Sequence, residues 1–411
     1  MTAALSILTA APPRRVTEPR PPAVPVPGLY VHVPFCAHKC HYCDFYSITH
    51  QPESRMVHFV DLLLKEAATW TAPGRPCPRP RTIFFGGGTP SLLPLEQMQR
   101  LLIGLRSVFD CSDCDEWTIE ANPATITNEY CHMLHENSVT RISMGAQSFD
   151  RAELAVLERR HDPDDVPRGL ALARAAGIKR LNIDLIFAIC GQNLDSWSRS
   201  LNAALALRTG HLSCYGLTYE PNTALAVRRR LGRVQAVDAE TELAMLFQTR
   251  CRLAEAGLPA YEISNYAQPG EECRHNLLYW SGGDYIGLGP SAASHVQGWR
   301  WKNAPHLGDW ESAVESAESP AADVEHLSPL RRAGELAMLS LRLSRGLVYE
   351  DFSRAFGIDA KKIFADPIAR YSQLGFLHAD IRGARLTDSG IAVADSLAVE
   401  FMLDEDGASQ P

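Results

Sequence analysis

Three cysteines in one short loop carry the strongest chemical signal in this sequence. They stand in the segment Cys36-Ala-His-Lys-Cys40-His-Tyr-Cys43, directly after the first strand-like apolar run. Three thiolates from one tight loop can hold three corners of a cubane iron–sulfur cluster, whereas the usual electron-transfer cluster takes four cysteines. The fourth iron then has an open coordination position at which a substrate can bind. The sequence therefore predicts a substrate-binding 4Fe–4S cluster on Cys36, Cys40 and Cys43.

A structural zinc site and a chance cluster of buried cysteines are the alternatives. Zinc sites normally use Cys-x2-Cys pairs and four ligands in total. Cys111 and Cys114 form such a pair, but the chain offers no matching partner pair. The chain has eleven cysteines, and an odd number in a long chain indicates reduced thiols or metal ligation rather than a secreted disulfide framework.

A glycine-rich segment, Gly86-Gly87-Gly88-Thr89-Pro90-Ser91, stands at the end of the second predicted strand. Consecutive glycines let a backbone approach a ligand closely and leave its N–H and C=O groups free to bond it. The alternative is a tight strand–helix turn in which Thr89 or Ser91 caps the next helix. A Walker-type phosphate loop is excluded because no Gly-Lys-Ser/Thr continuation follows.

Four further polar residues fall at or near the ends of apolar strands or of the helices beyond them: Glu120, Gln147, Arg159 and Asp184. Taken singly, each has a structural interpretation, as a helix cap or a solvated helix charge. Their joint position favours a site, because the ligands of a β/α barrel converge on its carboxyl-terminal rim from several strands.

The elements that would position these residues alternate along the chain. Strand-like apolar runs cover 29–35, 81–87, 116–122, 141–147, 180–187 and 212–219, and helical spacing covers 56–70, 95–109, 152–159, 166–176 and 197–207. Alternation of this kind predicts parallel strands with right-handed crossovers. Residues 28–220 are too few for eight units, so the expected fold class is α/β, a partial (β/α)6 TIM-like barrel.

The remaining chain suggests four further segments. Residues 1–27 are Pro-rich and are expected to form a disordered tail, and 406–411 a short second tail. Residues 221–323 are expected to form an α+β connector that ends in an Ala/Ser/Glu-rich linker at 311–323. Residues 324–405 show three helical patterns and a hairpin with its turn at Arg382–Gly383, the order of a winged-helix-like domain.

Composition and charge narrow the functional classes. The chain of 411 residues is 45% hydrophobic and 21% charged, as in a globular protein, and its net charge is −8. A general nucleic-acid binder needs a basic surface, and the predicted wing offers only Arg382 and Arg385. No apolar run reaches the length that spans a bilayer, so we expect no integral membrane protein and leave peripheral membrane contact open.

The cysteine loop also carries a family resemblance. The segment YVHVPFCAHKCHYCDFYS resembles the cluster loop of radical S-adenosylmethionine (SAM) proteins, in the branch that holds oxygen-independent coproporphyrinogen III oxidase and HemW-type haem chaperones. The resemblance runs through most of residues 28–405. In this superfamily the open iron chelates the amino and carboxylate groups of SAM, and an electron from the cluster cleaves SAM to a 5′-deoxyadenosyl radical.

The resemblance assigns residues to two SAM sites. Positions that contact the cluster-bound SAM are matched by Tyr30, Gly87 and Glu120. Positions that line a second SAM-like site in the oxidase are matched by Tyr42, Gly88, Thr89, Gln147, Arg159 and Asp184. The family's next segment usually reads Gly-Leu-Pro-Gly-Gln, and here it reads Ala188-Ile189-Cys190-Gly191-Gln192, so the resemblance does not imply the conformation of that loop.

Three features favour the chaperone branch over the oxidase. The oxidase has one more cysteine two residues after the third ligand, where this chain has Phe45, and it has a longer N-terminal segment. The segment from His275 to Trp280, HNLLYW, resembles a motif associated with haem binding in HemW-like proteins. Imidazole is a common axial haem ligand, and Tyr279 and Trp280 offer flat apolar surfaces to a porphyrin. A packed aromatic turn is the alternative, and Cys273 and His295 are alternative or additional ligands.

The sequence thus predicts a cytoplasmic haem chaperone with a 4Fe–4S cluster, SAM and haem as cargo. The expected partners are haem-accepting proteins and an electron donor, without nucleic acid, and both a monomer and a dimer stay open. Two alternatives remain, namely oxygen-independent coproporphyrinogen III oxidase and a radical SAM enzyme with another substrate. In the family, the C-terminal domain covers the mouth of the barrel rather than reading DNA.

Overall fold

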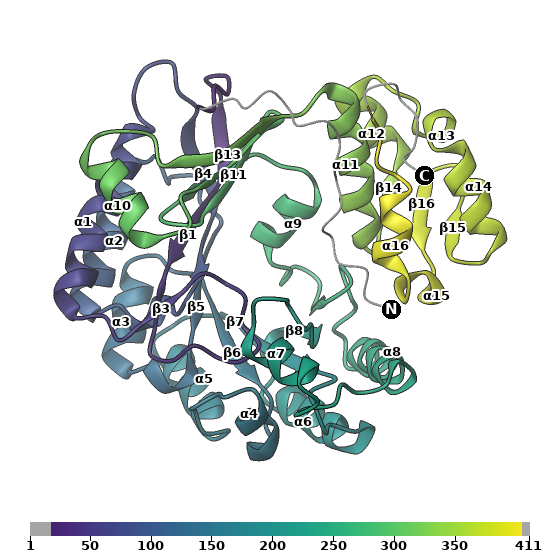
Figure 1. Ribbon diagram of the computed structural model, residues 1–411, viewed down its shortest axis with the longest axis horizontal. Coiled ribbons are helices and arrows are strands. Elements are labelled where there is room, and N and C mark those ends of the chain that lie inside the picture. Colours follow the sequence, from purple (N-terminus) through teal and green to yellow (C-terminus); the bar gives the residue numbers. More distant parts are fainter. Residues whose placement is uncertain (1–17, 405–411) are drawn as a thin grey trace.

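The computed structural model describes residues 18–404, so most of the predicted N-terminal tail and all of the tail at 406–411 lie outside the described residues. One curved sheet of 11 strands forms the centre of the molecule, and a smaller domain lies at one end of it (Figure 1). No helix among the described residues is long and apolar enough to cross a membrane.

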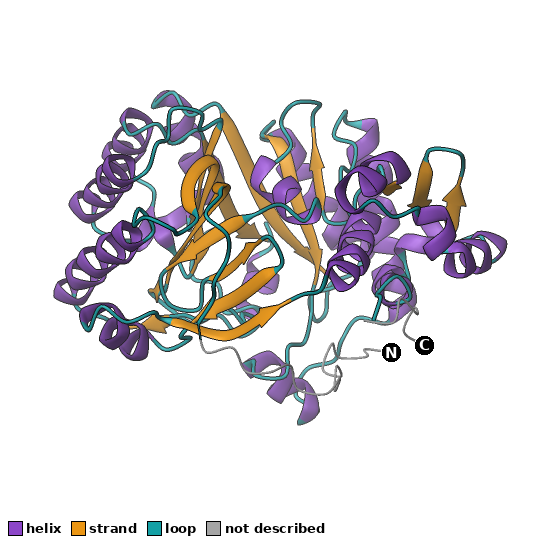
Figure 2. Cartoon of the chain, turned by 90° about the horizontal axis from the view of Figure 1, so that it is seen from above, coloured by secondary structure: helices purple, strands orange, loops and turns teal. Residues whose placement is uncertain are grey.

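Six parallel strands form the partial barrel that the sequence predicts. In sheet order they are β1 (Pro25–Val33), β4 (Cys77–Gly87), β5 (Glu116–Ala121), β6 (Arg141–Gln147), β7 (Arg180–Phe187) and β8 (Gly210–Gly216). The helices on the outer side of the curve are α1 (Glu53–Thr69), α2 (Leu95–Val108), α3 (Asn128–Glu136), α4 (Arg151–Val156), α5 (Asp165–Ala175) and α6 (Leu194–Ala206), labelled in Figure 1 and seen from above in Figure 2. The fold class is confirmed.

Strand β1 begins at Pro25, four residues before the predicted run at 29–35. Pro25 is paired with Cys77, and Val26 with Pro78, so the end of the predicted tail belongs to the sheet. A proline is tolerated at the first position of a strand, which is why the Pro-rich composition hid this start.

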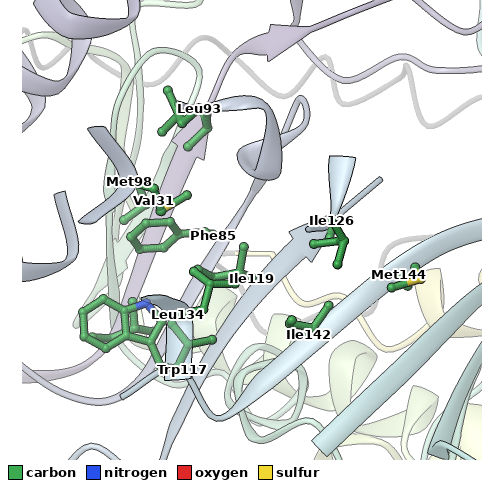
Figure 3. Close-up of a cluster of buried hydrophobic side chains, with 14 of the residues drawn as sticks. Val31, Phe85, Leu93, Met98, Trp117, Ile119, Ile126, Leu134, Ile142 and Met144 are labelled. Carbon is green, nitrogen blue, oxygen red and sulfur yellow. The ribbon is translucent and has the colours of Figure 1, made fainter. Parts of the chain in front are cut away.

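The outward side chains of the barrel strands make the main core. Val31, Phe85, Ile119 and Ile142 are register partners on four neighbouring strands, and all are fully buried. Leu93, Met98 and Leu134 cover them from the helical layer (Figure 3). Each such side chain contributes about 1.5–3 kcal/mol when it leaves water. Because side chains alternate along a strand, this packing turns the residues between them toward the interior of the barrel.

The predicted connector belongs largely to the same sheet. β9 (Asn265–Ala267) pairs with β8, and β10 (Tyr285–Leu288) pairs in parallel with β1 on the other side of the barrel. The sheet continues through β11 (Ala293–Val296), β12 (Trp299–Asn303) and β13 (Ala321–His326). The expected linker at 311–323 therefore needs correction, since it contains most of α10 (Leu307–Glu315) and the start of β13. β13 is half-exposed, and its sequence does not alternate between apolar and polar residues. Its small residues are therefore typical of a linker as well as of a strand.

Two short strands near the cysteines and three helices of the predicted connector remain. They are β2 (Phe35–Cys36) and β3 (Ile48–Thr49), which bound the cysteine loop, and α7 (Ala224–Arg230), α8 (Ala239–Glu255) and α9 (Arg274–Trp280). α9 lies inside the curve of the sheet, between the barrel strands and the C-terminal domain (Figure 1).

The C-terminal domain has its own apolar cluster and a three-stranded sheet. Its elements are α11 (Pro329–Arg342), β14 (Leu347–Val348), α12 (Tyr349–Phe356), α13 (Ala360–Ile363), α14 (Ala365–Gln373), β15 (Leu377–Ala379), β16 (Gly383–Leu386), α15 (Asp388–Ile391) and α16 (Ala394–Val399). Three helices and a hairpin occur where we expected them. After the hairpin the chain forms two short helices, α15 and α16, because it leaves the helical conformation at Val393.

Candidate cofactor site

The three cysteines lie beyond the carboxyl end of β1: Cys36 ends β2, and Cys40 and Cys43 lie on the loop between β2 and β3. All three thiols are free and partly accessible. The N–H of Cys43 donates to the carbonyl of Cys40 at 3.2 Å, which turns the loop back on itself. Burial raises the pKa of the Cys43 thiol, and the charges of Cys40 and Cys36 raise it further. A hydrogen bond from the backbone of Phe45 and the positive charge of Lys39 lower it. The three sulfur atoms therefore lie close enough to influence one another.

Lys39 shapes the end of this loop. Its Nζ donates to the carbonyl of Phe45 at 2.5 Å and to the hydroxyl of Ser47 at 3.2 Å. The ring of Phe45, the residue that distinguished the two branches in the sequence, is 69% exposed. It is thus a surface feature next to the cysteines and has no packing role.

The other side of the loop is held by Glu158. Its carboxylate lies 2.8 Å from Nε2 of His38 and 3.4 Å from Nε2 of His41. The backbone of His41 also donates to the carbonyl of Leu157 at 3.3 Å and accepts from the N–H of Leu225 at 2.9 Å. The loop is therefore attached both to the segment after α4 and to α7.

The glycine segment packs directly on the strand that leads into the cysteine loop. The N–H groups of Gly88 and Thr89 donate to the carbonyls of Val33 and Phe35, both at 2.8 Å. A Cβ on Gly88 would lie 2.7 Å from both carbonyl oxygens, so no larger residue fits there. Oγ1 of Thr89 lies 3.5 Å from Sγ of Cys36. The glycines thus bring the end of β4 into contact with the first cysteine.

Arg159 reaches the same loop from the segment after α4. Its Nη1 lies 3.9 Å from Sγ of Cys40, and its Nη2 donates to the carbonyl of Gly145. A Cβ on Gly145 would lie 2.8 Å from Nε2 of Gln147 and 3.2 Å from Nη2 of Arg159, so this glycine makes room for both side chains. The buried Nε of Arg159 has no hydrogen-bond partner among the described residues, which leaves one N–H for a ligand.

Two carboxylates face the interior of the barrel below this rim. Burial raises the pKa of Glu120 to about 8, the charge of Asp184 raises it further, and the N–H of Gly87 lowers it. Burial also raises the pKa of Asp184, although hydrogen bonds from Ser213, Ser143 and Asn182 lower it. No cation among the described residues forms an ion pair with Glu120. A cationic ligand would therefore relieve its burial.

All nine residues that the resemblance assigns to SAM keep some exposure to solvent: Tyr30, Tyr42, Gly87, Gly88, Thr89, Glu120, Gln147, Arg159 and Asp184. The charge of Glu120 acts on the pKa of Tyr30, and those of Arg159 and Asp184 act on the pKa of Tyr42. Several of these side chains therefore lie close to one another at the carboxyl end of the barrel strands. Unpaired carboxylates beside a free guanidinium N–H suit a ligand that carries both charges.

The zinc alternative lacks its second pair of thiols. Cys111 and Cys114 precede β5, at the amino end of the barrel strands, whereas the cysteine loop follows the carboxyl end of β1. Across residues 18–404, no group of three or more His, Cys, Asp or Glu side chains, the loop cysteines included, is arranged to hold one metal ion.

His275, the haem ligand expected from the sequence, is packed inside the protein in this structure. Its ring is fully buried, with Nδ1 2.9 Å from the Thr82 hydroxyl and Nε2 2.8 Å from the Tyr279 hydroxyl. The ring stacks on Phe84 at 5.4 Å between centroids, and burial lowers its pKa to about 3. Both nitrogens are occupied, so His275 offers iron no free lone pair in this structure. A sequence motif does not distinguish a ligand from a packed imidazole.

The rest of the motif joins α9 to its surroundings. The Tyr279 ring meets that of Tyr285 at 4.5 Å, and Trp280 lies 4.7 Å from the guanidinium of Arg342 on α11. Cys273 donates its thiol hydrogen to Glu116 at 3.4 Å. His295, on β11, is buried, and its Nε2 has no hydrogen-bond partner among the described residues.

A series of hydrogen-bonded polar side chains inside the barrel was not predicted from the sequence. Nδ2 of Asn182 donates to Asp184 at 2.8 Å, and Oδ1 of Asn182 lies 2.6 Å from Nδ1 of His211. Nε2 of His211 lies 3.0 Å from the hydroxyl of Tyr261, which accepts from the N–H of Cys273 at 3.4 Å. This chain of polar groups connects Asp184 at the rim of the barrel to α9. Asn182 could have been found from the sequence, because it stands two residues before Asp184 and alternate residues of a strand share a face.

Comparison with known proteins agrees with this geometry. A family model described as the radical SAM superfamily matches residues 30–204, and one described as the HemN C-terminal domain matches residues 327–393. The haem chaperone HemW of Lactococcus lactis is 30% identical over 380 residues, which cover 92% of this chain and 98% of the relative. The chain belongs to the HemW family. Haem chaperone HemW of Mycobacterium tuberculosis is 35% identical over 356 residues, which cover 85% of this chain and 91% of the relative.

Among solved structures, the HemW-family chain resembles coproporphyrinogen III oxidase (HemN) from Escherichia coli. The TM-score is 0.80, with 93% of this chain and 91% of HemN covered, at 23% sequence identity. At this identity the likeness concerns the fold alone. Members of the HemW family and HemN thus share the partial barrel and the C-terminal domain.

Proposed function

We propose that this chain is a haem chaperone that binds a 4Fe–4S cluster through Cys36, Cys40 and Cys43 and binds SAM beside it. It then passes haem to acceptor proteins. The observation that carries the proposal is the meeting of three free thiols with Thr89 and Arg159 at one rim, in a chain that aligns with 98% of a haem chaperone HemW.

The donor set and its neighbours suit these cofactors. Three thiolates on one loop are ligands for iron, and the cluster, when bound, supplies the electron that SAM cleavage requires. Glu120 is a buried carboxylate without an ion-pair partner and favours the positively charged part of SAM. Arg159 has an unpartnered N–H for a carboxylate. Tyr30 and Tyr42 border the site and exclude water from these charges.

The cluster assignment is tested by iron and sulfide analysis after anaerobic reconstitution. Single Cys36→Ser, Cys40→Ser and Cys43→Ser variants are expected to lose most of the bound iron. A Cys111→Ser variant serves as the control and is expected to keep it. Equal iron content in all four variants would contradict the assignment.

Two imidazoles near α9 are candidates for the haem ligand. His275 has to exchange its bonds to Thr82 and Tyr279 for a bond to iron. A specific observation favours His295, because its Nε2 is the nitrogen without a partner. We expect that one of the variants His275→Ala and His295→Ala loses the Soret band of bound haem. Thr82→Val, which frees Nδ1 of His275, is expected to bind haem at least as tightly as wild type. If both alanine variants keep wild-type haem affinity, neither imidazole is the ligand.

The proposed partners and compartment follow from the same chemistry. All eleven cysteines of the chain are free, and thiols and an open iron need a reducing environment such as the cytoplasm. Haem-accepting proteins and an electron donor complete the proposed set of partners. The oxidase alternative is not favoured, because its support is a shared fold at 23% identity, whereas the HemW relatives match over most of the chain.

A further inference from the structure

Four arginines form an unusual basic patch at the end of α7. Arg228, Arg229, Arg230 and Arg233 fall within six consecutive residues of a chain whose net charge is −8. We call this patch the arginine face. Arg229, Arg230 and Arg233 are exposed, and two apolar side chains beside them, Val227 and Leu231, are 38% and 58% exposed.

The arginine face is attached directly to the cysteine loop. The N–H of Leu225 on α7 donates to the carbonyl of His41, which is adjacent to Cys40 in sequence. Nη1 of Arg228 lies 3.1 Å from Nδ1 of the same histidine. α7 therefore covers the outer side of the loop that would hold the cluster, as its position next to the barrel mouth shows (Figure 1).

A small apolar cluster fixes α7 in this place. It consists of Leu157, Ile186, Ile189, Leu217 and Leu225, and it is separate from the main core. Tyr42 of the cysteine loop and Tyr219 pack against it, and the guanidinium of Arg229 lies 4.4 Å from the ring of Tyr219. The arginine face and the cysteine loop are thus packed on the same apolar cluster.

The charge of the arginine face is not neutralised within the described residues. No carboxylate there forms an ion pair with any of the four guanidinium groups. Glu242 is close enough for Arg229 to lower its pKa against the effect of burial, but it does not pair with it. Uncompensated positive charge with exposed apolar side chains fits an acidic protein surface, because complementary charge speeds encounter and fixes orientation.

We propose that the arginine face is the docking surface for the protein that reduces the cluster, an acidic one-electron carrier protein. The proposal rests on the cluster binding proposed above. One electron leaves the reduced carrier and enters the cluster, so the carrier is oxidised and the cluster reduced by one electron each. No bond or proton of the chain changes in this step.

Two other anionic partners fit the surface less well. A membrane-surface helix needs a broad apolar face to bury among lipids. α7 uses Leu225 to bind the loop beneath it, and only Val227 and Leu231 remain outside. A nucleic acid is held through contacts to many phosphates along its backbone, whereas the arginine face has four arginines within six residues.

The test compares two charge-reversed variants of the reconstituted protein. The first combines Arg229→Glu, Arg230→Glu and Arg233→Glu and keeps Arg228, which contacts His41. The control combines Lys179→Glu, Arg199→Glu and Lys362→Glu, three exposed residues on other elements that give the same change in net charge. Titration calorimetry measures binding of oxidised flavodoxin at low and high salt, and dithionite reduction of the cluster serves as the reference.

The expected result is a loss of flavodoxin affinity of about tenfold or more in the first variant and much less in the control. Wild-type affinity should fall with salt, and that of the first variant should change little. Dithionite should reduce the cluster equally in all three proteins. The proposal is overturned if both variants bind flavodoxin alike, or if the wild type binds phosphatidylglycerol vesicles and not flavodoxin. Flavodoxin binding is measured on the protein without cluster as well, so a failure to assemble the cluster would refute the proposed function separately.

Discussion

The side chains at the rim of the barrel combine opposite charges that are not paired with each other. Glu120 and Asp184 lie in a poorly solvated interior, and burial raises the pKa of both. Arg159 lies across from them with a free N–H. Ionising two neighbouring carboxyl groups in a poorly solvated place costs free energy, and a bound cation removes that cost. At the scale of residues, the site is therefore built for a ligand with a permanent positive charge.

Glu120 makes SAM binding depend on pH. Its pKa is raised to about 8, so the carboxyl is largely neutral at pH 7 and ionised at pH 9. The affinity for the sulfonium of SAM should therefore rise between pH 7 and pH 9, by about tenfold at most. Titration calorimetry with SAM at both pH values measures this rise. Glu120→Gln should bind more weakly and lack this component. Any change with pH that the variant retains belongs to SAM itself, and identical pH profiles would refute the role of Glu120.

At the scale of elements, the ends of β1 and β4 form one unit. The glycine segment after β4 bonds the strand before Cys36, and this contact works because Gly88 has no Cβ. The cysteine loop is thus positioned by the sheet on one side and by Glu158 on the other. The glycines therefore place the thiols, whatever contact they also make with SAM.

Gly88→Ala should damage the cysteine loop. Its Cβ would lie 2.7 Å from two backbone carbonyls, and overpacking of this kind costs about 1–3 kcal/mol. We expect a lower melting temperature and a reduced iron content after reconstitution. Gly308→Ala is the matched control, since a Cβ there meets no atom within 4 Å. Wild-type iron content in Gly88→Ala would show that the contact does not position the cysteines.

The elements also show what the sequence could and could not predict. The six barrel strands were found because they are continuous apolar runs, as Val31, Phe85 and Ile119 illustrate. β10 to β13 were missed because they are short and partly exposed, and because partners such as Tyr285 and His295 become apparent only once the sheet is assembled. Residue types and spacing predicted which residues lie at the rim of the barrel, because its glycines, carboxylates and cysteines stand at the ends of the predicted strands. They could not predict that Thr82 and Tyr279 occupy both nitrogens of His275.

At the scale of the whole molecule, one buried carboxylate links the extra strands to the barrel. Glu66 on α1 accepts hydrogen bonds from the N–H of Gly289 at 2.8 Å, Nδ2 of Asn303 at 2.6 Å and Nε1 of Trp310 at 3.0 Å. These donors come from the turn after β10, from β12 and from α10. Burial raises the pKa of Glu66 from its ordinary value of 4.5 to about 7, although the three donors lower it.

Glu66 should make stability fall as the pH rises from 5 to 8. The folded protein keeps a proton on this carboxyl that the unfolded chain releases near pH 4.5, so the stabilisation is complete below that pH and lost above about 7. The loss amounts to at most about 3 kcal/mol. Urea unfolding of the wild type and of Glu66→Gln over this range measures it. The advantage of the wild type over the variant should shrink with pH, and a constant difference would contradict the assignment.

The central claim is that this member of the HemW family carries haem rather than oxidising a porphyrinogen. One anaerobic preparation with cluster and SAM tests it, by titration with haem and by incubation with coproporphyrinogen III. The account predicts saturable binding of one haem per chain, with a dissociation constant of about 1 μM or lower, and no protoporphyrinogen IX. Turnover of coproporphyrinogen III without saturable haem binding would contradict it.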